Sequence, residues 1–289
     1  MEKRTVNEQN MDEHSQLTLL RSKRFLPFFS TQFLGAFNDN IFKNTLMFLI
    51  AFSAVDTIGL ETNIVMNLAA LLFMFPFFLF SSIAGQIADK YEKSKIIRIV
   101  KLAEIGIMSM AALCFLTDSY ILLLLLLFLM GAQSTFFGPV KYAILPQHLR
   151  DDELVGGNAL VEMGTFVAIL LGTIGAGLLM EFENTKILTA SAVVIAAITG
   201  YLTSRGIPVA KSSDPNMKIN FNIITTTVQI LKYAREDRSV FLSIMAISWF
   251  WFLGATYITQ FPVFTKEVLF GGPSVNTLLL AVFSISIGI

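Results

Sequence analysis

Residues 32–44 read Gln32-Phe-Leu-Gly-Ala-Phe-Asn-Asp-Asn-Ile-Phe-Lys-Asn44 and lie in the middle of an apolar span that runs from Phe25 to Phe52. The span is long enough to cross a bilayer, which takes about 20 residues. Asp39 falls near the expected midplane, and Lys43 follows one helical turn later on the same face. A charged side chain at this depth costs at least about 2.5–3.5 kcal/mol on insertion scales, so it needs a partner or a water-filled cavity.

Two interpretations of this polar stretch are open. Asp39 and Lys43 stand at i, i+4 spacing and can partly neutralise each other, which would give a self-contained pair that attaches the helix to its neighbours. In the second interpretation the stretch forms the polar wall of a central pathway, the usual role of ionisable residues inside a membrane. The flanking residues Asn38, Asn40 and Asn44 favour the pathway, because they supply more polar groups than one ion pair requires.

The composition is that of a membrane protein. Hydrophobic residues make up 54% of the chain, charged residues only 15%, and the mean hydropathy is +0.67. These values predict a membrane protein. Eight apolar runs along the chain then predict an all-α fold with eight spans. The spans are Phe25–Phe52, Ile64–Ala84, Ile96–Leu116, Ile121–Tyr142, Leu154–Met180, Ile187–Thr203, Ser239–Phe261 and Ser274–Ile289. Because the last span is still apolar at Ile289, we expect the sequence to be the N-terminal portion of a longer protein.

The distribution of positive charge predicts the topology. Most of the 21 Lys and Arg residues lie in the N-terminal tail and after the second, fourth and sixth spans, so these segments are expected in the cytoplasm. The predicted layout is a cytoplasmic tail (1–24), a six-helix bundle (25–205), a cytoplasmic linker with an interfacial helix (206–238) and the start of a second bundle (239–289). This order is typical of transporters built from two six-helix halves.

The loop after the second span reads Gly85-Gln-Ile-Ala-Asp89-Lys90-Tyr-Glu-Lys93. It resembles the signature Gly-x-x-x-Asp-Arg/Lys-x-Gly-x-Arg/Lys of the major facilitator superfamily, although Glu92 replaces the second glycine. The resemblance implies a major-facilitator-type helical bundle. It also implies that Gly85 permits close helix approach, and that Asp89, Lys90 and Lys93 belong to a charge network that latches the two halves. The alternative is an ordinary basic cytoplasmic loop.

Longer blocks are similar to the bacterial lysophospholipid transporters: residues 32–40, Gly138-Pro-Val-Lys141-Tyr142-Ala-Ile-Leu, and residues 153–177. Asn38 stands where a glycine is common in that family. The resemblance implies a multi-pass protein of the bacterial inner membrane that returns lysophospholipid to the inner leaflet for re-acylation, in some members fused to an acyltransferase. Asp39, Asn40 and Lys43 would then bind the headgroup and Lys141 the phosphate, with Asp89 helping to gate.

The fifth span carries a row of small residues, through which another helix can approach closely. The row consists of Gly164, Ala168, Gly172 and Ala176. Asn158 and Glu162 extend the row and are further candidates for substrate binding, although Glu162 could instead bond to a neighbouring helix. Lys141 could also extend its amine to the membrane surface without binding phosphate. Lys101 and Glu104, in the third span, are expected to be structural.

Several classes of function find no support in the sequence. It has no Gly-x-x-x-x-Gly-Lys-Ser/Thr loop for nucleotide, and Glu153 occupies the aspartate position of an acyltransferase His-x-x-x-x-Asp motif starting at His148. One cysteine and two histidines predict no metal site. The basic residues lie in the loops on one side of the membrane, a distribution that gives no support to nucleic-acid binding. We therefore expect no catalytic residues and no cofactor. The remaining alternatives are an exporter of another amphiphile or drug, and a non-transporting anchor for a fused lipid-modifying enzyme.

Overall fold

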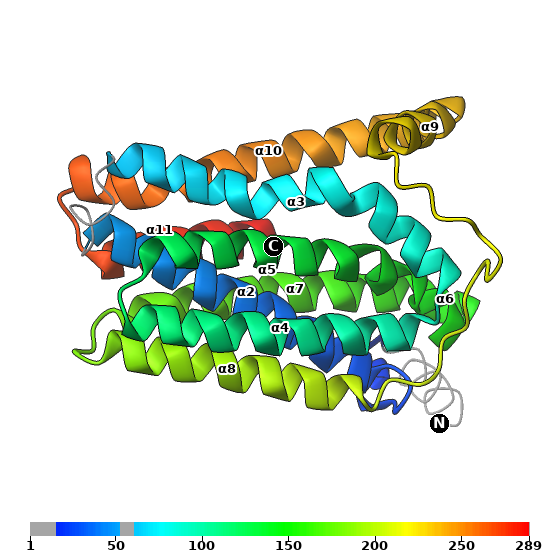
Figure 1. The fold of residues 1–289 in the computed structure, drawn as a ribbon, viewed down its shortest axis with the longest axis horizontal. Helices are drawn as coiled ribbons and strands as arrows, with labels where there is room; N and C mark the ends of the chain where they lie inside the picture. Colours follow the sequence, from blue (N-terminus) through cyan, green and yellow to red (C-terminus); the bar gives the residue numbers. More distant parts are fainter. Residues whose placement is uncertain (1–15, 53–60, 289) are drawn as a thin grey trace, which may run out of the picture.

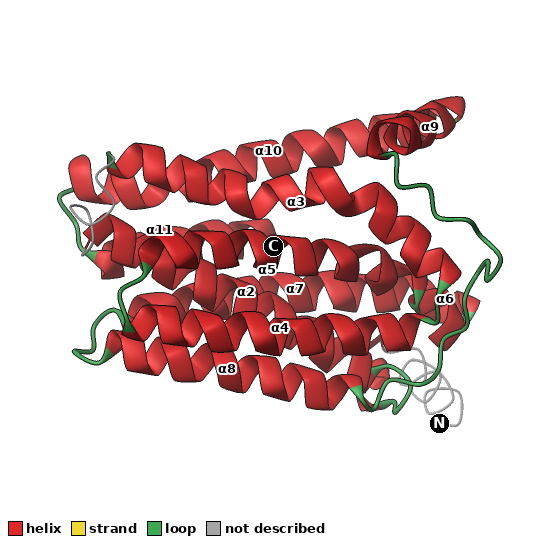
Figure 2. Cartoon of the chain, in the orientation of Figure 1, coloured by secondary structure: helices red, strands yellow, loops and turns green. Residues whose placement is uncertain are grey.

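The computed structural model describes residues 16–52 and 61–288, and these residues form a bundle of long helices (Figures 1 and 2). The long helices are α2 (Leu26–Phe52), α3 (Thr62–Lys90), α4 (Lys93–Leu116), α5 (Tyr120–Ala143), α7 (Leu154–Leu179), α8 (Thr185–Ser204), α10 (Arg238–Glu267) and α11 (Pro273–Gly288). The short ones are η1 (Gln16–Arg21), α6 (Leu145–His148), η2 (Asp151–Glu153) and α9 (Ile223–Glu236). The predicted all-α class is confirmed. Residues 1–15 of the predicted tail and the end of the last span at Ile289 lie outside the described residues.

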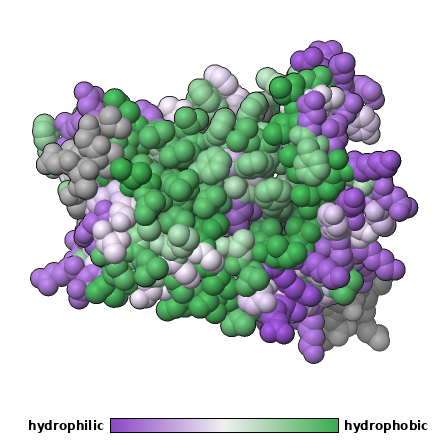
Figure 3. Space-filling view, viewed as in Figure 1, coloured by the Kyte–Doolittle hydropathy of each residue, from purple (hydrophilic) through white to green (hydrophobic). Residues whose placement is uncertain are grey.

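Six of the described helices are long and apolar enough to cross a membrane: α3, α4, α5, α7 with η2, α8 and α10. The 27-residue α2 is not among them, because its polar stretch offsets the apolar residues at its ends. The 16 residues of α11 make a shorter apolar helix. Figure 3 shows the result, a hydrophobic middle band with hydrophilic residues gathered at both ends of the bundle. The chain is therefore a multi-pass membrane protein.

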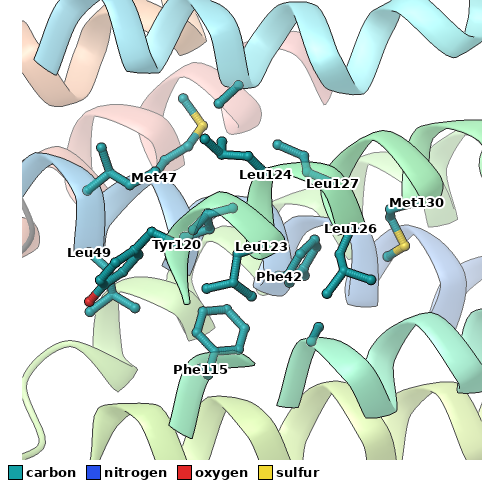
Figure 4. Packing of buried hydrophobic residues seen from close by; sticks show 14 of the residues in the cluster. Phe42, Met47, Leu49, Phe115, Tyr120, Leu123, Leu124, Leu126, Leu127 and Met130 are labelled. Carbon is teal, nitrogen blue, oxygen red and sulfur yellow. The ribbon is translucent and has the colours of Figure 1, made fainter. Parts of the chain in front are cut away.

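The helices pack in pairs around α2 and α5. α2 lies against α7 and α8, α3 lies against α5, and α4 contacts both α5 and α8 (Figure 1). Figure 4 shows the apolar core where Phe42 of α2 meets Phe115 of α4 and Leu123 of α5. The rings of Phe42 and Phe115 are edge to face, with centroids 5.8 Å apart. Such a pair adds about 0.5–1.5 kcal/mol beyond its buried area.

The small residues of α7 face α2. A Cβ atom at Gly172 would lie 2.8 Å from the backbone oxygen of Phe37, and one at Gly164 would lie 2.6 Å from the ring of Phe29. Ala168 and Ala176 are fully buried in the same row. Lipid provides no hydrophobic drive between helices, so α2 and α7 are held together by this close contact and by hydrogen bonds such as that from Asn44 Nδ2 to Thr173 Oγ1, at 2.9 Å. The polar stretch of α2 is thereby fixed against a rigid neighbour.

One end of the bundle, here called the linker end, carries α6, the α3–α4 loop and the non-helical residues 205–222 (Figure 1). Glu92 caps α4 by accepting hydrogen bonds from the N–H groups of Ser94 and Lys95, at 2.8 and 3.1 Å. Its carboxylate also accepts from the N–H of Ala210, at 3.0 Å. Burial opposes the charged form, but these hydrogen bonds outweigh it and lower the pKa of Glu92. The residue that replaces the family glycine therefore ties the linker to the loop.

The same linker is also held by neighbours of Glu92. Lys93 Nζ donates to the backbone oxygen of Lys211 and to the hydroxyl of Ser213, both at 3.0 Å. The backbone oxygen of Asp89 accepts from the N–H groups of Ser213 and Asp214. We call the part of the linker held by these bonds, residues 210–214, the strap. Beyond the strap, α9 contacts α3 and α10 and leaves apolar side chains such as Ile224 exposed. Its predicted placement at the membrane interface stays a prediction.

Candidate functional site

A cavity of about 730 Å³ lies between α2, α3, α4, α5, α7 and α10. One wall is polar and is contributed by α2, α4, α5 and α7. Its side chains are Gln32, Asp39, Asn40, Lys43, Lys101, Glu104, Gln133, Ser134, Lys141, Tyr142 and Thr165. The opposite wall is largely apolar and comes from α3 and α10, with Phe73, Met74, Phe77, Trp251, Phe252 and Ile258. The cavity is therefore amphipathic, with a polar wall on one side and a largely apolar wall on the other.

Asp39 and Lys43 both line this cavity, but they do not form the ion pair that their spacing suggested. Asp39 Oδ2 accepts a hydrogen bond from Ser134 Oγ of α5, at 2.9 Å. Lys43 Nζ instead lies over the ring of Phe73 of α3, 5.3 Å from its centroid. Of the two interpretations left open by the sequence, the structure does not show the self-contained pair, because each side chain turns to a different neighbouring helix. Both charges face the cavity without an ionic partner among the described residues.

Lys101 and Glu104 form the fully buried ion pair of the interior, with Nζ and Oε2 2.7 Å apart. Glu104 also accepts hydrogen bonds from Asn38 Nδ2, at 2.8 Å, and from Gln133 Nε2, at 3.1 Å. Gly35 leaves the room that the Lys101 amine occupies, since a side chain there would collide with it. The carboxylate thus has three donors from three helices, the arrangement expected of a structural pair.

Lys141 turns inward, towards α7. Its Nζ donates to Thr165 Oγ1 at 2.9 Å and lies 3.5 Å from Glu162 Oε1. Thr165 Oγ1 in turn lies 3.0 Å from Gln32 Oε1 of α2. The side chain of Lys141 is only 12% exposed, so it lines the cavity instead of reaching out to the membrane surface.

The other two candidates for substrate binding lie outside the cavity. Asn158 is exposed, and its Nδ2 donates to the backbone oxygen of Leu154 at 2.8 Å. Glu162 accepts a hydrogen bond from the hydroxyl of Tyr142, besides its contact with Lys141. The structure thus brings Asp39, Asn40, Lys43 and Lys141 to one cavity and leaves Asn158 and Glu162 beside or away from it.

The residues of the signature loop lie at the linker end, away from this cavity. Apart from the adjoining backbone of α3, no atom of the described residues lies within 4 Å of where a Cβ at Gly85 would be, so no neighbouring helix approaches it closely. Lys93 is fully buried under the linker, and Lys90 lies over the ring of Tyr91 at 5.7 Å. In this part of the chain the loop is engaged by the linker, and a latch between halves stays a prediction.

The sequence analysis missed three neutral residues of the polar wall, Gln133, Ser134 and Thr165. Each connects two helices: Gln133 reaches Glu104, Ser134 reaches Asp39, and Thr165 lies between Lys141 and Gln32. A signal was available, because Gln133 and Ser134 interrupt the apolar run 121–142. Neutral polar residues commonly hydrogen-bond across helices in membranes, so isolated ones merit the same attention as charges.

Two hydrogen bonds join α10 to the first helices near the end opposite the linker. Lys266 Nζ donates to the backbone oxygen of Ala51 at 2.6 Å, and Gln260 Nε2 donates to Asn67 Oδ1 at 3.2 Å. The cavity lining, in contrast, extends to Lys141 and Tyr142 in the last turn of α5, at the linker end.

Comparisons with known proteins identify a family and several similar proteins. The model of the Major Facilitator Superfamily matches residues 28–289. The Lysophospholipid transporter LplT of Enterobacter sp. (strain 638) is 28% identical over 241 residues, which is 83% of this chain and 57% of the relative. The transporter of the same name from Klebsiella pneumoniae (strain 342) is 27% identical over 243 residues, covering 82% of this chain and 56% of the relative. The chain spans about half the length of these curated relatives. With most of its length matched by the family model, the chain belongs to the Major Facilitator Superfamily.

Proposed function

We propose that this chain is the first six-helix half, the linker and the start of the second half of a transporter that moves lysophospholipid to the inner leaflet, where it is re-acylated. The observation that carries the proposal is the amphipathic cavity. A lysophospholipid has a charged headgroup and one acyl chain, and the two walls of the cavity match these two parts. The volume of about 730 Å³ lies within the usual range of roughly 300–1,000 Å³ for small-molecule sites.

The residues of the polar wall have distinct roles in this proposal. Asp39 accepts hydrogen bonds from the amine or hydroxyl groups of the headgroup, and Asn40 supplies further hydrogen bonding. Lys43 and Lys141 attract the phosphate as point charges. The aromatic side chains of α3 and α10 hold the acyl chain. The relatives named as lysophospholipid transporters support this choice of substrate.

The proposal is tested with Asp39→Asn combined with Lys43→Met in the full-length protein, in vesicles supplied with lysophosphatidylethanolamine. Removing both charges leaves no unpaired charge, so the variant should fold, whereas uptake should fall about tenfold or more with the lost charged contacts. Leu113→Ala, a change on the exposed face of α4, serves as control. Near-normal uptake by the folded double variant would overturn the substrate role.

Two other functions give different results, the first in the vesicle assay and the second in whole cells. A transporter of another amphiphile or drug would be inhibited by cationic dyes and poorly by lysophosphatidylethanolamine. A non-transporting anchor for a lipid-modifying enzyme, fused or associated, would keep full lipid uptake by the cell when Asp39 alone is changed to Asn. Competition by lysophosphatidylethanolamine and loss of uptake in Asp39→Asn would speak against both.

We also propose the orientation that the basic loops predict, with the linker end in the cytoplasm of a bacterial cell and the protein in its inner membrane. A reporter fused after Ser204 should then be cytoplasmic, and one fused after Glu183 should lie outside. The reverse pattern would contradict both the orientation and inward movement of substrate.

A further inference from the structure

A second hollow, of about 540 Å³, lies on the outer face of the bundle and is separate from the transport cavity, although both reach Gln133. α3 and α4 each pack on α5 but contact each other little, so a groove remains between them with α5 as its floor. Phe136 and Gln133 of α5 form that floor, and Phe80 of α3 stacks on Phe136 with ring centroids 6.0 Å apart. We call this hollow the α3–α4 groove.

The α3–α4 groove runs along α4 from the linker end into the membrane-spanning part. Lys95, Ile99 and Ala103 follow one another at helical spacing on its α4 side. At ~1.5 Å per residue, this stretch is roughly 12 Å long. Ile99 is 67% exposed, so the groove opens outward to the lipid and not into the bundle. On the same face, Figure 3 shows a broad hydrophobic surface with a small hydrophilic spot in its middle.

The mouth of the groove is positively charged. Lys95 lines it and is exposed, and Lys90 lies over Tyr91, another lining residue. Within residues 16–52 and 61–288, neither lysine forms an ion pair. Glu92 also lines the mouth, but its carboxylate is engaged by the N–H groups of Ser94, Lys95 and Ala210. Lys95 thus stands at the mouth of an apolar slot without an ion pair, and Lys90 lies beside the mouth, on the ring of Tyr91.

We propose that the α3–α4 groove binds an anionic phospholipid of the leaflet at the linker end. One acyl chain lies in the slot between α3 and α4, and the phosphate contacts Lys95 and Lys90. The charge of the mouth selects this class of lipid, because juxtamembrane lysines attract anionic headgroups. The groove lies among membrane-spanning helices, where lipid chains are the surrounding medium. The bound lipid would brace α3 and α4, which contact each other little.

The experiment uses phosphatidylglycerol carrying a diazirine in one acyl chain, at a low fraction in phosphatidylcholine vesicles with the full-length protein. After photolysis, adducts are mapped by mass spectrometry. We expect adducts on the Ile99–Ala103 segment to exceed those at Leu113, an exposed α4 residue outside the groove, by several-fold. Unlabelled phosphatidylglycerol should compete, and unlabelled phosphatidylcholine should not.

Two variants test the mouth and the slot separately. Lys95→Gln should lower groove labelling roughly fivefold, since one lysine near the surface has about that effect on anionic-lipid binding. Ala103→Trp should fill the slot and lower labelling, with Leu113→Trp as its control. Lys95→Gln preserves the test if Ala103→Trp does not fold.

Three results would overturn the proposal: equal labelling at Leu113, equal competition by both lipids, or cross-links between protein copies in place of lipid adducts. Asp39→Asn with Lys43→Met should leave groove labelling unchanged, so failure of the transport proposal is distinguishable from failure of this one.

Discussion

The two pairs of ionisable residues in the interior, Lys101 with Glu104 and Asp39 with Lys43, differ in how they are satisfied. Lys101 and Glu104 are in direct contact, and the carboxylate has three hydrogen-bond donors. Within the described part of the chain, Asp39 has one hydrogen-bond donor, the hydroxyl of Ser134, and Lys43 lies over one aromatic ring without an ion pair. In the first pair the two charged groups contact each other, whereas in the second pair both side chains face the cavity. A lysine and a carboxylate at nearly the same spacing therefore serve structure in one case and face a cavity in the other.

The largest expected effect comes from breaking the satisfied pair. Lys101→Met leaves Glu104 as a buried charge without a counter-charge, which should cost on the order of 3–5 kcal/mol of stability. Lys43→Met removes a cation–π contact, worth roughly 0.5–2 kcal/mol, and an attraction to Asp39 beyond ion-pair distance. Thermal unfolding in detergent measures both. Adding Glu104→Gln to Lys101→Met should recover most of the loss, and similar losses from Lys101→Met and Lys43→Met would erase the distinction between the pairs.

The second prediction disturbs the support of the cavity pair. Gly172→Leu would place a side chain against the backbone of Phe37 and push α2 away from α7, at a cost of about 1–3 kcal/mol. Leu171→Ala, at the neighbouring exposed position, should be much milder. Yield and thermal stability in detergent are the measurements. Equal losses would mean that close packing at residue 172 does not position Asp39 and its neighbours.

How much of this could be read from the sequence depends on the kind of contact. The helices follow apolar runs, and the prediction from Phe25–Phe52 matches α2 at Leu26–Phe52. The partners of Asp39 and Lys43 could not be predicted, because i, i+4 spacing brings two Cβ atoms close but does not decide which neighbour each side chain chooses. Ser134 lies 95 residues from Asp39, and only tertiary packing brings them together. The attachment of the linker to the α3–α4 loop was also unforeseen, because the irregular linker contributes mostly backbone groups, which leave no pattern in the sequence.

A smaller difference in stability is expected between variants of two neighbouring residues of α5: Gln133, which bonds Glu104, and Ser134, which bonds Asp39. Gln133→Met removes a donor to the buried carboxylate of Glu104 and should cost about 1.5–3 kcal/mol of stability. Ser134→Ala removes the donor to Asp39, which still faces the cavity, and should cost about 0.5–1.5 kcal/mol. Lysophospholipid uptake should respond the other way, falling more in Ser134→Ala at equal protein levels. A larger stability loss in Ser134→Ala would show that Asp39 is a structural residue after all.

The smallest expected effect is at the linker end, where the carboxylate of Glu92 accepts hydrogen bonds from three backbone N–H groups and lies away from the transport cavity. Its pKa is lowered in the folded protein, so the stabilisation it gives is present above the ordinary glutamate value of about 4.3 and is lost as the pH falls through the lowered value. A spin label at Lys211→Cys, an exposed linker position, should stay immobile from neutral pH downward and become mobile only in acid. With Glu92→Gln the neutral amide keeps only part of the capping, so the label should be more mobile at all pH values and show no acid step. A label at Lys218→Cys, which lies beyond the strap, controls for general unfolding. An acid step that persists in Glu92→Gln would assign the release to another group and remove Glu92 as the residue that fastens the linker.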